Sequence, residues 1–119
     1  MHVELRPIGI VRRDGETSRL EIAPAYAAAL KDIDKPRALD VLYWMHELTD
    51  DQRKRLQVRP RGDPSRSLQG VFSLRSPMRP NPIGVTTVKL LRREGTTLIV
   101  SGLDAHDGSP IIDIKSAKG

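Results

Sequence analysis

A ten-residue stretch at 75–84, RSPMRPNPIG, combines three prolines with two arginines. Each proline fixes its own φ, removes a backbone donor and pushes the preceding residue toward an extended conformation. A loop restricted in this way loses little entropy when a ligand binds. Arg75, Arg79 and Asn81 offer polar groups suited to a small ligand with an anionic group, and Gly84 would let the backbone approach it closely. The alternative is a stiff turn between two strands.

A second group of candidate residues lies near the C-terminus, where Asp104, His106 and Asp113 occur close together. Carboxylates and imidazoles can accept a proton as general bases. Asp113 alternates with isoleucines along an expected strand, so it could equally face solvent or pair with Lys115 on the same face. We expect no metal site, because the chain has no cysteine and no second histidine lies near His106 in sequence.

Positive charge is concentrated in residues 53–93, which hold eleven Lys or Arg and one acid, Asp63. This segment carries a net charge of +10, whereas the remainder of the chain carries −5. Such asymmetry favours a positive face for an anionic partner, although an unevenly charged solvated surface has the same composition. The four aromatic side chains are too few for a broad base-stacking platform.

Short apolar runs separated by glycine-containing turns predict an antiparallel sheet. A helix is expected where alanines and an early Pro24 occur, and a second, short one where Thr49 precedes acids and then bases. The helices are expected over 23–33 and 49–57, and the strands over 3–12, 18–22, 38–45, 70–74, 85–93, 96–105 and 111–115. We therefore expect one domain over 1–119, a mainly β, antiparallel β-barrel-like fold with one or two short helices.

The chain contains no apolar run long enough to span a membrane, and its N-terminus is too polar for a signal peptide. It also lacks cysteines, which excludes disulfides. We therefore expect no membrane association and a cytoplasmic location.

The stretch GVFSLRSPMRPNPIGVTTVKLL closely resembles GVFATRSPxRPNPIG, the signature of the TrmO/YaeB-like family, also called TsaA-like. Five further stretches resemble family segments in the same order: RPIGIVR, LEIAPAYAAALKDI, VLYWMH, RPRGDP and GLDAHDGSPIIDIK. The resemblance covers essentially the whole chain, and its central motif is long and unusual.

This resemblance implies a β-barrel-like fold, a homodimer, and S-adenosylmethionine as the methyl donor without a metal. Characterised members methylate the exocyclic nitrogen of a modified adenosine in tRNA. The later family segment implies catalytic roles for Asp104, Asp113 and Lys115. The family's cofactor-binding loop falls on Arg75, Ser76, Pro77, Met78, Arg79, Pro80, Asn81, Pro82, Ile83 and Gly84.

The chain also departs from the family pattern. It lacks the insertion with a PRQ segment after the first strand, has RALD at 37–40 where SH is usual, and reads DIKSA in place of DIKPY and a C-terminal extension. Three functions therefore remain open: a methyltransferase for tRNA, a methyltransferase for a small molecule, and a non-catalytic S-adenosylmethionine-binding regulatory protein. For a tRNA substrate, we expect phosphate contacts from Arg53, Lys54, Arg55, Arg59, Arg61 and Arg66.

Overall fold

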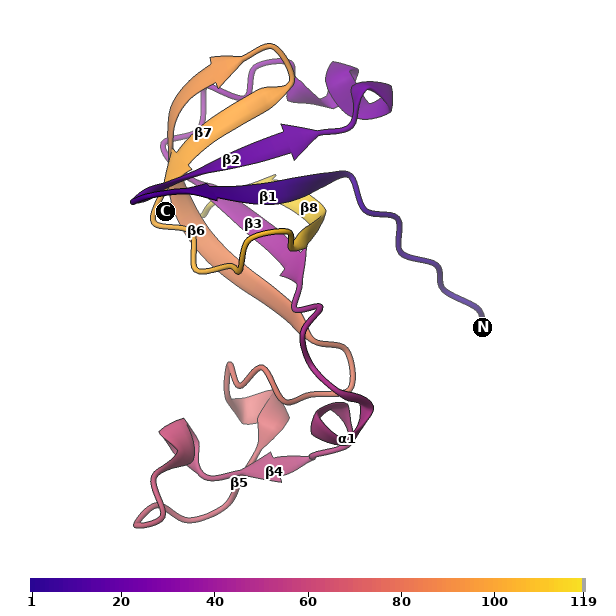
Figure 1. The fold of residues 1–119 in the computed structure, drawn as a ribbon, viewed down its shortest axis with the longest axis vertical. Helices are drawn as coiled ribbons and strands as arrows, with labels where there is room; N and C mark the ends of the chain where they lie inside the picture. Colours follow the sequence, from indigo (N-terminus) through magenta and orange to yellow (C-terminus); the bar gives the residue numbers. More distant parts are fainter. Residues whose placement is uncertain (119) are drawn as a thin grey trace.

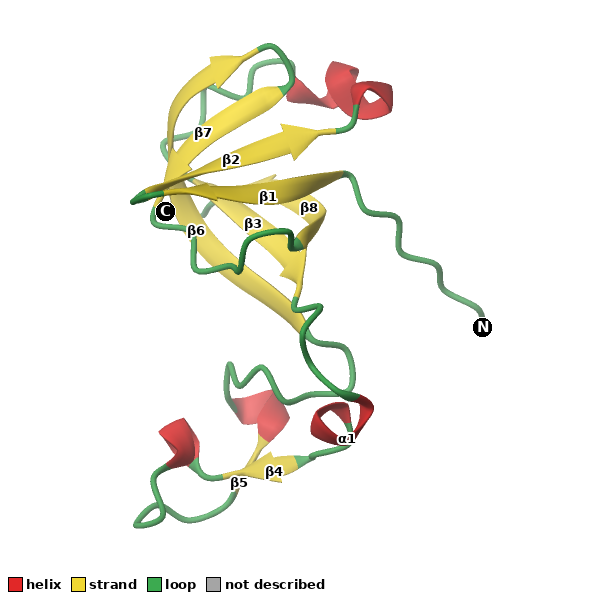
Figure 2. Cartoon of the chain, viewed as in Figure 1, coloured by secondary structure: helices red, strands yellow, loops and turns green. Residues whose placement is uncertain are grey.

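The computed structural model describes residues 1–118, and six antiparallel strands form its main sheet (Figures 1 and 2). The strands are β1 (Gly9–Asp14), β2 (Thr17–Ile22), β3 (Leu39–Trp44), β6 (Ile83–Glu94), β7 (Thr97–Ser101) and β8 (Pro110–Ser116). They pair in the order β1-β2-β7-β6-β3-β8, and β8 pairs with β1, so that the sheet closes into a barrel. The expected mainly β, antiparallel, barrel-like fold is confirmed.

Alternate residues of the strands point into the barrel and form its core, as period-two patterning requires. In β3, Leu39, Val41 and Tyr43 are buried while the residues between them are half-exposed. Val11, Leu20, Val88 and further residues of the other strands complete the cluster. The core therefore lies inside the barrel and fixes the register of β3 against β6 and β8.

Two tight turns connect neighbouring strands as the sequence predicts. Gly15 joins β1 to β2 with φ +62°, and Gly95 joins β6 to β7 with φ +61°. Both values lie in the left-handed region that glycine adopts without a steric penalty. These turns set the hairpin registers, because each leaves two residues between the paired strand ends.

Residues 45–82, which we call the lobe, extend from the end of β3 and the start of β6, below the barrel in Figure 1. The lobe contains α1 (Asp50–Arg53), the strand pair β4 (Gln57–Val58) and β5 (Gln69–Gly70), and the 3₁₀ turns η2 (Pro60–Gly62) and η3 (Val71–Ser73). Thr49 caps α1 in a capping box with Gln52, as its position before the acids predicts.

The helix expected over 23–33 is a 3₁₀ helix, η1 (Pro24–Leu30), and not an α-helix. No side chain caps its N-terminus. Asp32, just beyond it, has φ 63°, which ends helical geometry. A segment this short lacks the hydrogen bonds that stabilise an isolated α-helix, so packing of Leu30 and Tyr26 against the core decides its shape.

Other boundaries differ where a specific contact intervenes. The expected strand over 70–74 is wrong, because η3 occupies most of this segment. The Arg79 guanidinium donates hydrogen bonds to the carbonyls of Val71 and Leu74. The first strand begins only at Gly9, where its register with β2 and β8 starts. The polar helix ends at Arg53, and β7 ends before Gly102, whose φ is +87°.

Candidate ligand pocket

A pocket of about 420 Å³ lies where the barrel meets the lobe. Its walls come from the end of β3, the start of β6, the proline-rich loop and the connection between β7 and β8. The lining residues are Tyr43, Met45, His46, Glu47, Leu48, Arg75, Pro77, Arg79, Ile83, Gly84, Val85, Thr86, Asp104, Ala105, His106 and Ser109. Apolar side chains with a few convergent charged groups are typical of small-molecule sites.

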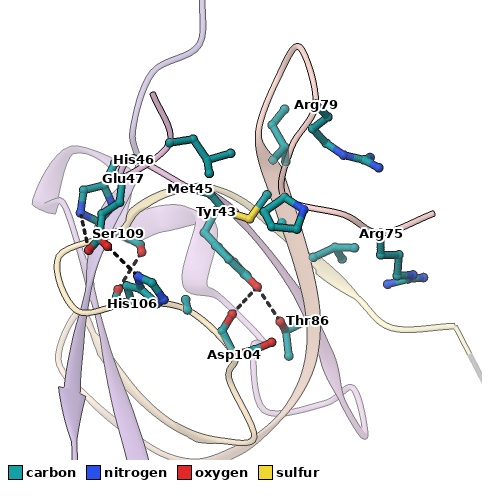
Figure 3. Close-up of a pocket in the computed structure, with 16 residues that line it drawn as sticks. Tyr43, Met45, His46, Glu47, Arg75, Arg79, Thr86, Asp104, His106 and Ser109 are labelled. Carbon is teal, nitrogen blue, oxygen red and sulfur yellow. Dashed lines mark hydrogen bonds and ion pairs between the residues drawn. The ribbon is translucent and has the colours of Figure 1, made fainter. Parts of the chain in front are cut away.

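Tyr43 forms the centre of the pocket, between its two charged sides (Figure 3). Its hydroxyl donates to the backbone carbonyl of Asp104 and lies 3.0 Å from Thr86 Oγ1. The ring lies across the strand pair from Gly84, and a Cβ on that glycine would lie 2.5 Å from Tyr43 Cε2. The space that Gly84 leaves open is therefore filled by Tyr43.

Arginine side chains hold the proline-rich loop in shape from the inside. The Arg79 guanidinium donates to the carbonyls of Ser76 (2.8 Å), Val71 (2.6 Å) and Leu74 (2.6 Å). Arg53 Nε donates to the carbonyl of Pro80 at 3.0 Å. Some of the backbone carbonyls in and beside the loop therefore already accept hydrogen bonds from arginine side chains of the protein. These bonds hold the loop in one conformation before a ligand binds.

The pocket includes half of the predicted cofactor-binding residues. Arg75, Pro77, Arg79, Ile83 and Gly84 line it. Arg75 is exposed and makes no hydrogen bond or ion pair within residues 1–118, so its guanidinium is available to an anionic group. The other five lie outside the lining: Ser76, Met78 and Pro80 are half-buried, Asn81 is exposed, and Pro82 is buried and accepts from Met45 N at 2.7 Å.

The three predicted catalytic residues are separated in the structure. Asp104 lines the pocket. Asp113 and Lys115 lie on β8 outside the pocket lining, and their side chains pair with each other at 3.5 Å. The sequence predicted this ion pair between Asp113 and Lys115, on the same face of the strand, as the alternative to a catalytic role for Asp113.

Sequence reasoning did not select Glu47, which lines the pocket between two histidines (Figure 3). Its Oε2 lies 3.0 Å from His106 Nδ1, and its Oε1 lies 3.8 Å from His46 Nε2. The adjacency of His46 and Glu47 at a strand end was the available signal. The contact with His106, 59 positions away, has no local signature.

All six residues predicted to contact RNA lie in the lobe, and none of them lines the pocket. Lys54, Arg55, Arg59, Arg61 and Arg66 are exposed. Arg53 differs from them: it is half-buried, and its guanidinium lies over the Trp44 ring, 5.3 Å from the centroid. Trp44 is itself half-buried beneath this arginine.

Within the part of the chain that the structure describes, no three His, Asp or Glu side chains gather to hold a metal ion. Nor does any described helix have the length and apolar character needed to cross a membrane.

In the lobe, hydrogen bonds from the backbone N–H and the hydroxyl of Ser65 hold the pKa of Asp63 below its usual range.

Comparison with known proteins relates the chain to one family. The model of the tRNA-methyltransferase O N-terminal domain matches residues 6–117. A probable S-adenosyl-L-methionine-binding protein of Archaeoglobus fulgidus is 43% identical, with coverage of 97% of this chain and 34% of that protein. A protein of the same description from Methanothermobacter thermautotrophicus is 41% identical over 97% of this chain and 90% of its own length.

A crystal structure of TrmO has the same fold, with a TM-score of 0.76 and 28% identity. The match covers 99% of this chain and 58% of the TrmO chain. The chain therefore spans little more than half of the TrmO protein it resembles, and about a third of the Archaeoglobus relative.

Proposed function

The chain belongs to the family of the tRNA-methyltransferase O N-terminal domain, and from that premise we propose that it is an S-adenosylmethionine-dependent methyltransferase. We further propose that its acceptor is the exocyclic nitrogen of a modified adenosine in tRNA. The observation that carries the proposal is the position of the pocket, which is lined by the rigid arginine-flanked loop and lies where the barrel meets the basic lobe.

The pocket residues fit S-adenosylmethionine by charge and polarity. The free guanidinium of Arg75 suits the ligand's carboxylate, because arginine pairs with carboxylates through two parallel hydrogen bonds. The carboxylate of Asp104 suits a positive group of the ligand, and Met45, Ile83 and Val85 offer apolar surface to the adenine ring. A volume of about 420 Å³ falls in the usual range for pockets that take ligands of this size.

The lobe supports a polyanionic substrate. Within it, eight Lys or Arg residues occur with one acid, Asp63, from position 53 onward. Five of the six residues assigned to RNA are exposed. Arg53 donates to the Pro80 carbonyl, and Arg59 donates to the Arg66 carbonyl at 2.6 Å. Phosphate contacts of this kind position RNA without reading its bases, so they suit a substrate whose reacting base must enter a separate pocket.

Calorimetry with S-adenosylmethionine is the first test. Wild type should bind, and Arg75→Ala should weaken binding by roughly 1–3 kcal/mol, about ten- to a hundredfold. Arg12→Ala is the matched control, because Arg12 pairs with Glu21 on the far hairpin, outside the pocket. The absence of binding by wild type, or equal affinity of folded Arg75→Ala, would contradict the proposed site.

The acceptor is tested separately by mass spectrometry of tRNA and metabolites from cells with and without the gene. A modified adenosine present only with the gene would support tRNA as substrate. A methylated metabolite would favour the small-molecule alternative. Binding of S-adenosylmethionine without any methylated product would favour a regulatory protein. These alternatives follow from the chain's departures from the family pattern, such as RALD at 37–40 where SH is usual.

We also propose that the protein acts as a homodimer in the cytoplasm. Leu56, Leu68 and Phe72 on the lobe are exposed apolar side chains, and Phe72 is 82% exposed. Exposed apolar groups of this size suit burial against a second copy. Light scattering at micromolar concentration should give twice the mass of one chain, and Phe72→Ser should shift it toward the monomer. A monomeric wild type would contradict the dimer.

A further inference from the structure

A histidine–carboxylate pair lies on the side of the pocket away from the arginines (Figure 3). His106 Nδ1 lies 3.0 Å from Glu47 Oε2. Both side chains line the pocket. The other ring nitrogen of His106, Nε2, makes no hydrogen bond or ion pair with any residue that the structure describes.

The turn that carries His106 is held in place by the barrel. Ser109 donates to the His106 carbonyl from its hydroxyl at 2.7 Å and from its backbone N–H at 3.1 Å. Arg13 on β1 donates from its guanidinium to the Leu103 carbonyl at 2.5 Å and from its backbone N–H to Asp107 Oδ1 at 2.8 Å. The ring is therefore presented by a fixed turn, as a group acting on a substrate requires.

From this geometry we propose that His106 accepts the proton that the acceptor nitrogen loses, and that Glu47 is its positioning residue. The inference rests on the proposed function. A carboxylate beside Nδ1 selects the tautomer with the proton on Nδ1, because only that tautomer can donate to it. The lone pair of the neutral ring then lies on Nε2, which is the nitrogen without a partner in the protein.

The step balances without a further reactant. When S-adenosylmethionine supplies the methyl group, its carbon–sulfur bond breaks with both electrons going to sulfur, and the lone pair of the acceptor nitrogen forms the new carbon–nitrogen bond. The nitrogen is then positively charged, and Nε2 of His106 takes one of its protons. The resulting imidazolium is stabilised by the Glu47 carboxylate. Since 74% of the His106 side chain is exposed, the proton then passes to solvent.

Methyl transfer from labelled S-adenosylmethionine to total tRNA from cells lacking the gene tests the assignment. His106→Ala should lower kcat by about a hundredfold or more, the range of general-base catalysis, with little change in KM for S-adenosylmethionine. Added imidazole should restore part of the lost kcat. Glu47→Gln should lower kcat by a smaller factor and should not respond to imidazole. His2→Ala is the matched control, since His2 lies 3.3 Å from Glu4 in an exposed pair outside the pocket.

Nitrogen-15 NMR of the free protein gives a readout independent of activity. The neutral His106 ring should carry its proton on Nδ1 in wild type, and this preference should weaken in Glu47→Gln. A proton on Nε2 in wild type, or unchanged kcat in His106→Ala, would overturn the assignment while leaving methyl transfer intact. The absence of any transfer by wild type would overturn the proposed function and this inference together.

Discussion

Tyr43 and Gly84 face each other across β3 and β6, and the tyrosine ring occupies the space that a side chain at position 84 would need. The ring is 5% exposed, and its hydroxyl bonds to the Asp104 carbonyl and to Thr86. This contact joins the barrel core to the pocket wall. Glycine at position 84 is therefore required by the tyrosine beside it.

Gly84→Ala should destabilise the fold and disturb the pocket. A Cβ there would lie 2.5 Å from Tyr43 Cε2, so the ring must move and its hydroxyl must leave Asp104 and Thr86. Overpacking of this kind costs about 1–3 kcal/mol. Thermal unfolding should show a lower Tm than wild type. Gly70→Ala is the control, because nothing lies within 4 Å of its added Cβ. Equal Tm values for the two variants would contradict the prediction.

Arg53→Ala should weaken S-adenosylmethionine binding although Arg53 does not line the pocket. Its Nε bonds to the Pro80 carbonyl at 3.0 Å, and its guanidinium lies over Trp44. Without these two contacts the proline-rich loop should sample more conformations, and ligand binding must then carry the entropic cost of ordering it. Calorimetry should show an affinity reduced about three- to tenfold, in keeping with the loss of one ordinary hydrogen bond. Lys54→Ala, the exposed neighbour, should bind like wild type.

Arg61→Ala should weaken tRNA binding and reduce the slope of log affinity against log salt by about one unit. Arg61 is exposed in η2 and reaches no acid in the described residues. The affinity for S-adenosylmethionine should stay unchanged, since the pocket lies elsewhere. Filter binding at two salt concentrations measures the slope, with Arg12→Ala as the control on the barrel. A slope equal to that of wild type would mean that the charge serves solubility only.

Ser65→Ala should raise the pKa of Asp63 toward its usual value, because it removes the hydroxyl that donates to Oδ1 at 2.8 Å. The backbone donor from residue 65 remains, so the pKa should stay below the usual range. A lowered pKa in the folded state stabilises the protein at neutral pH, and this contribution is lost as pH falls through the folded-state pKa. Carboxyl chemical shifts across an acid titration measure both pKa values. The effect on stability should be small, since Asp63 is exposed.

The sequence alone determined the features that depend on neighbouring residues. The mostly apolar run at 38–45 predicted a strand, and the glycine of the EG pair at 94–95 predicted the turn at Gly95. The three prolines predicted a stiff loop, since each restricts its own torsion and that of the residue before it. Thr49 predicted the start of α1, because a threonine hydroxyl can accept a hydrogen bond from a backbone N–H of the first helical turn. All of these effects act over a few residues and are visible in the order of residue types.

Only the tertiary structure decided which distant side chains meet. Antiparallel pairing of β3 with β8 brought Glu47 to His106, and the register of β3 on β6 placed Tyr43 in the space beside Gly84. It also placed Asp113 outside the pocket, where it pairs with Lys115. Contacts of this kind depend on strand order and register over the whole barrel. The free energy that selects them is the burial of the shared core, to which residues far apart in the sequence contribute together.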